Sequence, residues 1–300
     1  MPQARANGIT IEYDVRGPDD GEPLLLIMGL GAQMTRWPDD FADRIAARGL
    51  QVIRFDNRDV GLSEKIEAGG APDLAAVFGA LKEGRKPDVA YTLDDMAADA
   101  VGLLDALGID RAHIVGASLG GMVAQLVAAD YPDRTRSLTS IMSTTGSREV
   151  PTATPAAAAV LNERGPDPRE DLEGYLAHSV RGSAVVGSPG YPVDPAVLRQ
   201  QALAAFNRSY YPHGFARQYA AAIASPDRRP KLKTVTAPTV VIHGAQDPLV
   251  PVEGGRDTAA HVAGADLRII EGMGHDIPPP LFDEIVEAIH SAVERARATV

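Results

Sequence analysis

Short apolar runs alternate with helical patterns through the first half of the chain. Residues 24–28 and 113–115 are continuously apolar or nearly so, which is typical of strands buried on both faces of a sheet. Residues 9–15 instead alternate between apolar and polar side chains, as an exposed early strand does. Further strand candidates are residues 51–56, 138–142, 239–242 and 267–270. The pattern predicts an α/β fold with a mostly parallel central sheet flanked by helices.

Helical spacing of apolar residues predicts helices over residues 37–48, 92–107 and 281–296. Thr92 and Asp95 are spaced as in a capping box, and Gly108 follows as a stop signal. Residues 1–7 contain no apolar run and are interpreted as leading into a polar turn.

The middle of the chain has a different pattern. Residues 146–230 contain no buried-strand run but are rich in Pro, Gly and Ala. We expect helical segments at residues 155–162, 169–180, 195–208 and 213–224. A helical block between two strands of an α/β core favours a lid over the carboxyl edge of the sheet, where ligands bind; the alternative is a loose surface extension. The expected organisation is a core over residues 1–145, a lid over 146–230, and the rest of the core over 231–300.

Composition excludes several classes of function. The net charge of −11 and the absence of Lys/Arg-rich runs argue against binding to nucleic acids or anionic membranes. There is no cysteine, and the seven histidines are scattered, so we expect no metal and no cofactor. No stretch approaches the roughly 18 apolar residues of a membrane span. These features fit a cytoplasmic protein that acts on a small molecule. They do not indicate an oligomeric state.

A G-x-S-x-G motif supplies the first candidate chemistry. Ser118 lies between Gly116 and Gly120, after the apolar run at residues 113–115 and before a helical stretch. In this strand–turn–helix context the serine occupies a strained corner with its hydroxyl exposed above the sheet. The two glycines are needed because a Cβ at either position would strike the neighbouring strand or helix. Ser118 is therefore a candidate nucleophile.

A serine nucleophile needs a base to accept its proton, and His275 is the best candidate. It follows the last predicted strand, in a loop where Gly272 and Gly274 provide freedom of movement. His243 ends a buried strand and is interpreted as a packed structural residue, while His113 lies on the wrong side of the corner. The other histidines belong to the lid or to surface helices.

The base needs a carboxylate to orient it, and Asp247 directly follows the strand at residues 239–242. Pro248 stiffens its turn, and the loop after residues 138–142 offers no early acid. The order Ser118, Asp247, His275 along the chain is the order that this architecture requires.

Two backbone N–H groups are expected to stabilise the oxyanion. One belongs to Leu119, the residue after the nucleophile. The other belongs to Leu30, between Gly29 and Gly31 in the loop after an early central strand; a plain turn is the alternative.

With these motifs in place, the chain resembles the α/β-hydrolase superfamily, and specifically its lid-bearing branch of serine esterases. The resemblance also covers residues 56–63, which are similar to the D-x-R-G-x-G-x-S turn of that branch. Two positions depart from the family pattern: Met28 replaces the usual histidine before Gly29, and Asp59 replaces the first glycine of the turn. The strand end at Met28 and the turn at Arg58 and Asp59 are similar to the aclacinomycin methylesterase-like proteins, which implies hydrolysis of methyl or other small esters.

The sequence thus predicts a serine carboxylesterase with an acyl-enzyme intermediate and a small ester as substrate. The same triad could serve a lactonase, a C–C bond hydrolase or a perhydrolase, and a ligand receptor with a vestigial triad is a further alternative. Arg58 and Asp56 are expected to brace their turn. Trp37 could line the pocket or belong to the core. The remaining candidate pocket residues are Gly29, Met122, Met142 and Met273.

Overall fold

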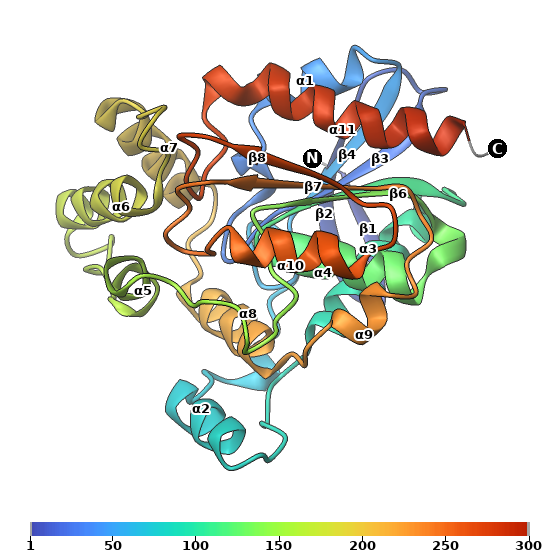
Figure 1. The fold of residues 1–300 in the computed structure, drawn as a ribbon. Helices are drawn as coiled ribbons and strands as arrows, with labels where there is room; N and C mark the ends of the chain where they lie inside the picture. Colours follow the sequence, from blue (N-terminus) through green and yellow to red (C-terminus); the bar gives the residue numbers. More distant parts are fainter. Residues whose placement is uncertain (1, 299–300) are drawn as a thin grey trace.

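A single eight-stranded sheet forms the centre of the protein in our computed structural model, which describes residues 2–298. Figure 1 shows this sheet between two layers of helices. The strands stand in the spatial order β1-β2-β4-β3-β5-β6-β7-β8. Their bounds are β1 (Gln3–Ala6), β2 (Ile9–Arg16), β3 (Glu22–Ile27), β4 (Leu50–Phe55), β5 (Ala112–Ala117), β6 (Thr135–Ile141), β7 (Thr239–Gly244) and β8 (Asp266–Ile270).

The sheet is mostly parallel. The neighbouring pairs from β4 to β8 are all parallel, whereas β1 pairs with β2, and β2 with β4, in antiparallel fashion. The predicted α/β fold with a mostly parallel sheet is confirmed. Because parallel strands end at the same edge, the loops after β3, β5, β7 and β8 meet on one side of the sheet.

The turn expected after residues 1–7 is present at Asn7 and Gly8, but the sequence pattern did not predict that residues 3–6 form the edge strand β1. This strand pairs with β2 in a register that sets Ala4 opposite Ile11. Its inward-facing residues, Ala4 and Ala6, are alanines with low strand propensity, so this four-residue strand has only a weak signal in the sequence.

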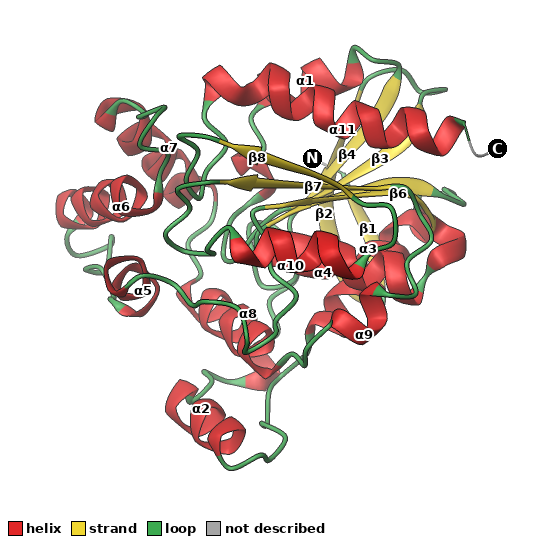
Figure 2. Ribbon diagram, viewed as in Figure 1, coloured by secondary structure: helices red, strands yellow, loops and turns green. Residues whose placement is uncertain are grey.

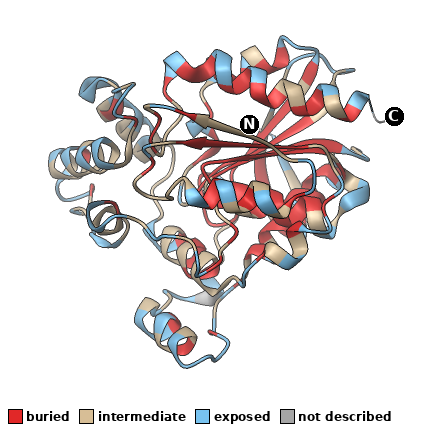
Figure 3. Ribbon diagram, in the orientation of Figure 1, coloured by how far each residue is buried: buried red, intermediate tan, exposed pale blue. Residues whose placement is uncertain are grey.

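Helices cover both faces of the sheet. α1 (Asp39–Ala46) and α11 (Phe282–Arg297) lie on one face, and α3 (Leu93–Ala106), α4 (Leu119–Asp130) and α10 (Glu253–His261) lie on the other (Figure 1). Alternate residues of β3 belong to different core clusters: Leu24 and Leu26 pack on the α11 side, and Leu25 and Ile27 on the α4 side. Burial on both faces, visible in Figure 3, explains why this run carries no polar alternation.

The helix predictions agree with the structure at their centres. The predicted capping box is present, since the Thr92 hydroxyl accepts from the amide of Asp95 and the Asp95 carboxylate accepts from the amide of Thr92 at 2.8 Å. Residues 37–48 and 281–296 correspond to α1 and α11. No sequence pattern had marked α2 (Leu74–Lys82), a helix that stands away from the sheet (Figure 1) and buries only Val77 and Ala80.

The residues between β6 and β7 form helices with no strand between them in the described chain. We call residues 146–230 the insertion. Figure 2 shows its helices α5, α6 and α7 beyond the arrowheads of β7 and β8. The insertion contains α5 (Pro155–Asn162), α6 (Leu172–Val186), α7 (Pro195–Arg208) and α8 (Pro212–Ala224), and α9 (Arg229–Leu232) begins at its end and contacts α4 and α10. Within residues 2–298 there is no helix with the length and apolar character to cross a membrane.

A buried histidine lies at the opposite, amino-terminal edge of the sheet. His113 is 1% exposed, its Nδ1 lies 2.8 Å from the Ser137 hydroxyl, and its Nε2 has no hydrogen-bond partner among the described residues. Burial lowers the pKa of His113 to about 4, although the nearby carboxylate of Glu22 opposes this effect. The native state therefore holds this ring neutral.

We predict that protonation of His113 destabilises the protein in acid. The pKa is about 6.5 in an unfolded chain, so the stabilisation is complete above that pH and is lost as the pH falls toward 4. The free energy of unfolding should fall by about 2–3 kcal/mol from this residue between pH 7 and pH 4. Urea unfolding of the wild type and of His113→Asn at both pH values tests this. An equal fall in the two proteins would contradict the prediction.

Candidate active site

Ser118 occupies a sharp corner between β5 and α4. Its backbone has φ 56° and ψ −122°, in the left-handed half of the map that non-glycine residues rarely adopt. A Cβ at Gly116 would lie 2.0 Å from the carbonyl oxygen of Gly120, and one at Gly120 would lie 2.1 Å from that of Ile27. The corner therefore requires both glycines, for the steric reason that the motif suggests.

Hydrogen bonds hold this strained backbone in place. The Ser118 amide donates to the Ile141 carbonyl at 2.9 Å, which ties the corner to the end of β6. The Ser118 carbonyl accepts from the amide of Gly121 at 2.9 Å and from the hydroxyl of Ser143 at 2.8 Å. Strain of this kind persists only where the surroundings hold it, and such sites are frequently functional.

The structure brings Ser118, Asp247 and His275 together. His275 Nε2 lies 2.9 Å from Ser118 Oγ, and His275 Nδ1 lies 2.7 Å from Asp247 Oδ2. The three residues follow β5, β7 and β8, whose carboxyl ends meet at one edge of the sheet. An imidazole in this line can accept the serine proton while the carboxylate fixes its tautomer.

Asp247 is held as a carboxylate. Burial by itself would raise its pKa, but the electrostatic interaction with His275 and the surrounding hydrogen bonds outweigh burial and hold the pKa well below its usual range. Its Oδ1 accepts from the amides of Leu249 and Val250, each at 2.9 Å. Oδ2 is thus left to accept from the imidazole.

His243 lies directly behind this carboxylate. Its Nε2 is 2.8 Å from the carbonyl oxygen of Val250 and 3.6 Å from Asp247 Oδ2, so its N–H donates to the carbonyl. The ring is completely buried. His243 therefore packs behind the Asp247 loop, in keeping with the structural role that the sequence indicated.

The loop after β3 brings Leu30 close to the nucleophile. The amide of Ala32 donates to the carbonyl of Gly29 at 3.2 Å, and Gly31 has φ 65°, which together make a tight turn around Leu30. A Cβ at Gly29 would lie 3.2 Å from that of Ser118, so the turn and the nucleophile are neighbours. No hydrogen bond joins the amide of Leu30 or Leu119 to another residue of the described chain. Both N–H groups are therefore free to donate a hydrogen bond to a ligand oxygen.

Hydrogen bonds to the insertion hold the turn around Leu30. Gln218 of α8 is fully buried, and its Oε1 accepts from the Gly31 amide at 2.8 Å while its Nε2 donates to the Arg58 carbonyl at 2.8 Å. Gln33 Nε2 donates to the carbonyl of Ala205 in α7 at 2.7 Å. The proposed oxyanion loop is thus attached to two helices of the insertion.

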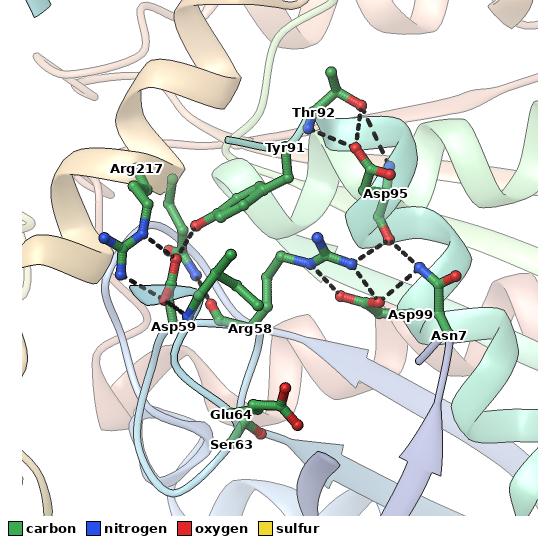
Figure 4. Close-up of polar contacts among 12 residues, drawn as sticks. Asn7, Arg58, Asp59, Ser63, Glu64, Tyr91, Thr92, Asp95, Asp99 and Arg217 are labelled. Atoms are coloured by element: carbon green, nitrogen blue, oxygen red, sulfur yellow. Dashed lines mark hydrogen bonds and ion pairs between the residues drawn. The ribbon is translucent and has the colours of Figure 1, made fainter. Parts of the chain in front are cut away.

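The turn after β4 carries two buried ion pairs that point away from each other (Figure 4). Arg58 donates to both carboxylate oxygens of Asp99 in α3, each at 2.6 Å. Asp59 accepts from Arg217 of α8 through two bonds of 2.8 Å and from the Tyr91 hydroxyl at 2.7 Å. Hydrogen bonds from these donors hold the pKa of Asp59 low despite its burial. Asp59 has φ 70°, which explains why the family pattern has glycine here.

The predicted pocket residues fall in different surroundings. Trp37 is fully buried and stacks on Phe41 with ring centroids 5.5 Å apart, which favours the core role that the sequence left open. Met142 and Met273 are buried in the same core cluster, and Met122 is half-buried against the other. The pocket role of Gly29 and the methionines stays a prediction.

Three residues of α8 lie at the site. Phe215 lies over the Leu30 turn, because a Cβ at Gly31 would come within 2.6 Å of its ring. Arg217 and Gln218 follow it on the same helix, and no sequence pattern marked these two residues. Their partners in the core lie more than a hundred residues away in the chain, so only the folded structure connects them. No group of His, Asp and Glu residues within the described chain could hold a metal ion.

The chain is similar in sequence to known hydrolases. A family model described as the alpha/beta hydrolase fold matches residues 22–279. A rhodomycin D methylesterase of Streptomyces peucetius is 28% identical over 299 residues, which cover 94% of each protein. A 3-oxoadipate enol-lactonase of Acinetobacter baylyi is 25% identical over 293 residues, which cover 95% of this chain and 94% of that protein.

Solved structures have the same fold. A meta-cleavage product hydrolase of Pseudomonas fluorescens superposes with a TM-score of 0.74 at 20% identity, over 99% of this chain and 98% of its own. An enol-lactonase of Burkholderia xenovorans gives a TM-score of 0.71 at 23% identity, over 98% of this chain and 100% of its own.

We predict that the corner tolerates no added methyl group at Gly116. Gly116→Ala should lower the free energy of unfolding by about 1–3 kcal/mol or more, because the new Cβ meets backbone atoms that cannot move aside. Gly79→Ala on α2 is the matched control, since nothing lies within 4 Å of its new Cβ. The control should raise stability by about 0.5–1 kcal/mol. Chemical denaturation measures both changes, and equal stability of the two variants would refute the steric argument.

Proposed function

The chain belongs to the alpha/beta hydrolase family, as its sequence motifs predicted, and on this premise we propose that it is a serine carboxylesterase. The observation that carries the proposal is the hydrogen-bonded line from Ser118 through His275 to Asp247, with distances of 2.9 and 2.7 Å. In the proposed reaction a small or methyl ester is hydrolysed through an acyl-enzyme on Ser118.

The hydrogen-bonded line from Ser118 through His275 to Asp247 supports the following acylation step. His275 Nε2 accepts the Ser118 proton as Oγ attacks the ester carbonyl, and the N–H groups of Leu119 and Leu30 stabilise the oxyanion. Asp247 accepts from Nδ1 and stabilises the imidazolium that forms. His275 then donates its proton to the departing alkoxide, which leaves as the alcohol.

Deacylation repeats these steps with water as the nucleophile. His275 removes a proton from water, the hydroxide attacks the acyl carbon, and the proton returns to Ser118 Oγ as the acid leaves. The side chains and amides of this chain supply each proton transfer and each oxyanion contact. The proposed reaction therefore needs no cofactor.

The insertion is proposed to act as a cap over this site. Its helices lie at the edge of the sheet where β7 and β8 end, and α8 holds the Leu30 turn through Gln218. The methylesterase likeness supports a methyl ester of a larger acid as substrate. The enol-lactonase likeness supports a second candidate, a lactone, since a lactone is a cyclic ester opened by the same steps.

We predict multiple turnover on short-chain p-nitrophenyl esters and on methyl esters, and loss of at least about 10³-fold in kcat for Ser118→Ala. Product identification on methyl esters, lactones and C–C hydrolase substrates separates the candidates. A single slow turnover on every ester would instead favour a ligand receptor, and residual activity in Ser118→Ala equal to that of the wild type would remove Ser118 from the mechanism.

We predict that Asp247→Asn lowers kcat by about 10⁴-fold with little effect on folding, because an amide can hold the imidazole in the wrong tautomer. Steady-state kinetics and circular dichroism measure the two effects. Asp257→Asn is the control, since Asp257 pairs with Arg229 and Thr145 outside the proposed site. Wild-type turnover in Asp247→Asn would exclude Asp247 as the partner of His275.

A further inference from the structure

The loop that carries His275 lies directly against the segment after α6. We call residues 186–190 the clamp segment and residues 272–276 the histidine loop. The amide of His275 donates to the carbonyl of Val186 at 2.7 Å, and the amide of Gly190 donates to the carbonyl of Gly272 at 2.9 Å. Two backbone hydrogen bonds thus join the proposed base to the insertion, one at each end of the contact.

Glycines allow the two segments to approach this closely. A Cβ at Gly274 would lie 2.3 Å from the carbonyl oxygen of Gly187, and one at Gly190 would lie 2.7 Å from the Cα of Gly272. The sequence analysis interpreted Gly272 and Gly274 as a source of freedom for the loop. At Gly274 the structure gives a different reason: there is no space for a side chain against the clamp segment.

Ser188 connects the centre of the two segments. Its side-chain oxygen accepts from the amide of Gly274 at 2.9 Å, and its hydroxyl donates to Asp276 Oδ1. Gly274 and Asp276 are the residues immediately before and after His275. Ser188 is 3% exposed, so water cannot readily replace these bonds. One hydroxyl therefore binds the backbone of the residue before the proposed base and the side chain of the residue after it.

We propose that Ser188 is a positioning residue for His275, acting from the insertion through Gly274 and Asp276. This inference rests on the proposed function, in which His275 transfers the protons. Ser188 does not touch the reacting atoms; it fixes the loop from which the imidazole reaches Ser118. A displacement of this loop by about 1 Å would be enough to lower the rate about 10²-fold.

The same hydrogen bonds also limit movement of the insertion. If this end of the insertion swung away from the core, it would break the bonds from His275, Gly274 and Gly190 and release the proposed base. Lifting of residues 186–190 is therefore incompatible with the proposed positioning of His275.

The test compares a methyl ester with a p-nitrophenyl ester of the same acid. Methoxide is a poor leaving group and needs the proton from His275, whereas p-nitrophenolate leaves without it. We expect Ser188→Ala to lower kcat/KM on the methyl ester by about 10- to 100-fold and on the p-nitrophenyl ester by clearly less. The ratio of the two values does not depend on the folded fraction, so general destabilisation would leave it unchanged.

A second readout requires no turnover. The proton shared by His275 Nδ1 and Asp247 should give a far-downfield proton NMR resonance, which is assigned by its loss in Asp247→Asn. We expect Ser188→Ala to shift or broaden this resonance and to speed hydrogen exchange at the amide of Gly274.

The matched control is Ser179→Ala, which removes another hydroxyl of the insertion, one that donates to the Tyr175 carbonyl at 3.0 Å within α6. It should leave the ester ratio and the resonance as in the wild type. Ser188→Thr keeps the hydroxyl and should restore both. If Ser188→Ala does not fold, Ser188→Cys replaces it, because a thiol fills a similar volume but makes only weak hydrogen bonds.

Different results would contradict the positioning role of Ser188 and the esterase proposal. If Ser188→Ala keeps both the ester ratio and the resonance of the wild type while esters are hydrolysed, the positioning role is wrong and the esterase proposal stands. If no ester is hydrolysed but the resonance responds to Ser188→Ala and not to Ser179→Ala, the positioning role stands and the esterase proposal fails.

Discussion

The site depends on one backbone corner, at Ser118. At φ 56° the residue lies where an L-amino acid is strained, and the corner closes because Gly116 packs against Gly120 and Gly120 packs against the carbonyl of Ile27 in β3. The contact with Ile27 brings Ser118 next to the loop that leaves β3. Packing between β3, β5 and α4 therefore sets both the position of the Ser118 hydroxyl and its distance from the Leu30 turn.

The insertion holds three loops at the candidate site. Gln218 binds the turn after β3, Arg217 binds the turn after β4, and Ser188 binds the loop after β8. Each of these residues lies in the insertion, and the bonds of Arg217 and Ser188 are buried, where an unpaired partner would be costly. The core supplies Ser118 and the ends of the strands, while the insertion fixes the loops around it.

The predictions made from the sequence agree with the structure where the residues that determine a structural element lie close together in the chain. The G-x-S-x-G corner and the capping box of α3 each depend on about five residues, and the apolar runs marked the central strands. His275 and Asp247 were predicted by elimination, because few histidines and acids follow a buried strand, and the structure places His275 between Ser118 and Asp247 at hydrogen-bond distances. Ser188 in a loop and Arg217 and Gln218 on a helix were not identified, because a lone serine, arginine or glutamine has no local signature. Their partners are set by tertiary packing. β1 was missed because it is short and its inward-facing positions are alanines, which have low strand propensity.

Asp59 illustrates how a departure from a family pattern can be interpreted once the structure is known. Glycine at this turn would adopt φ 70° without strain, whereas aspartate tolerates it at a moderate energetic cost. Unlike glycine, Asp59 provides a carboxylate, which accepts two hydrogen bonds from Arg217 and one from Tyr91, all of them buried. An ion pair buried this deeply adds little net stability over an apolar contact, but removing either partner leaves an uncompensated charge. The substitution therefore fixes the position of α8 on the core more than it strengthens the fold, and α8 is the helix whose Gln218 holds the Leu30 turn.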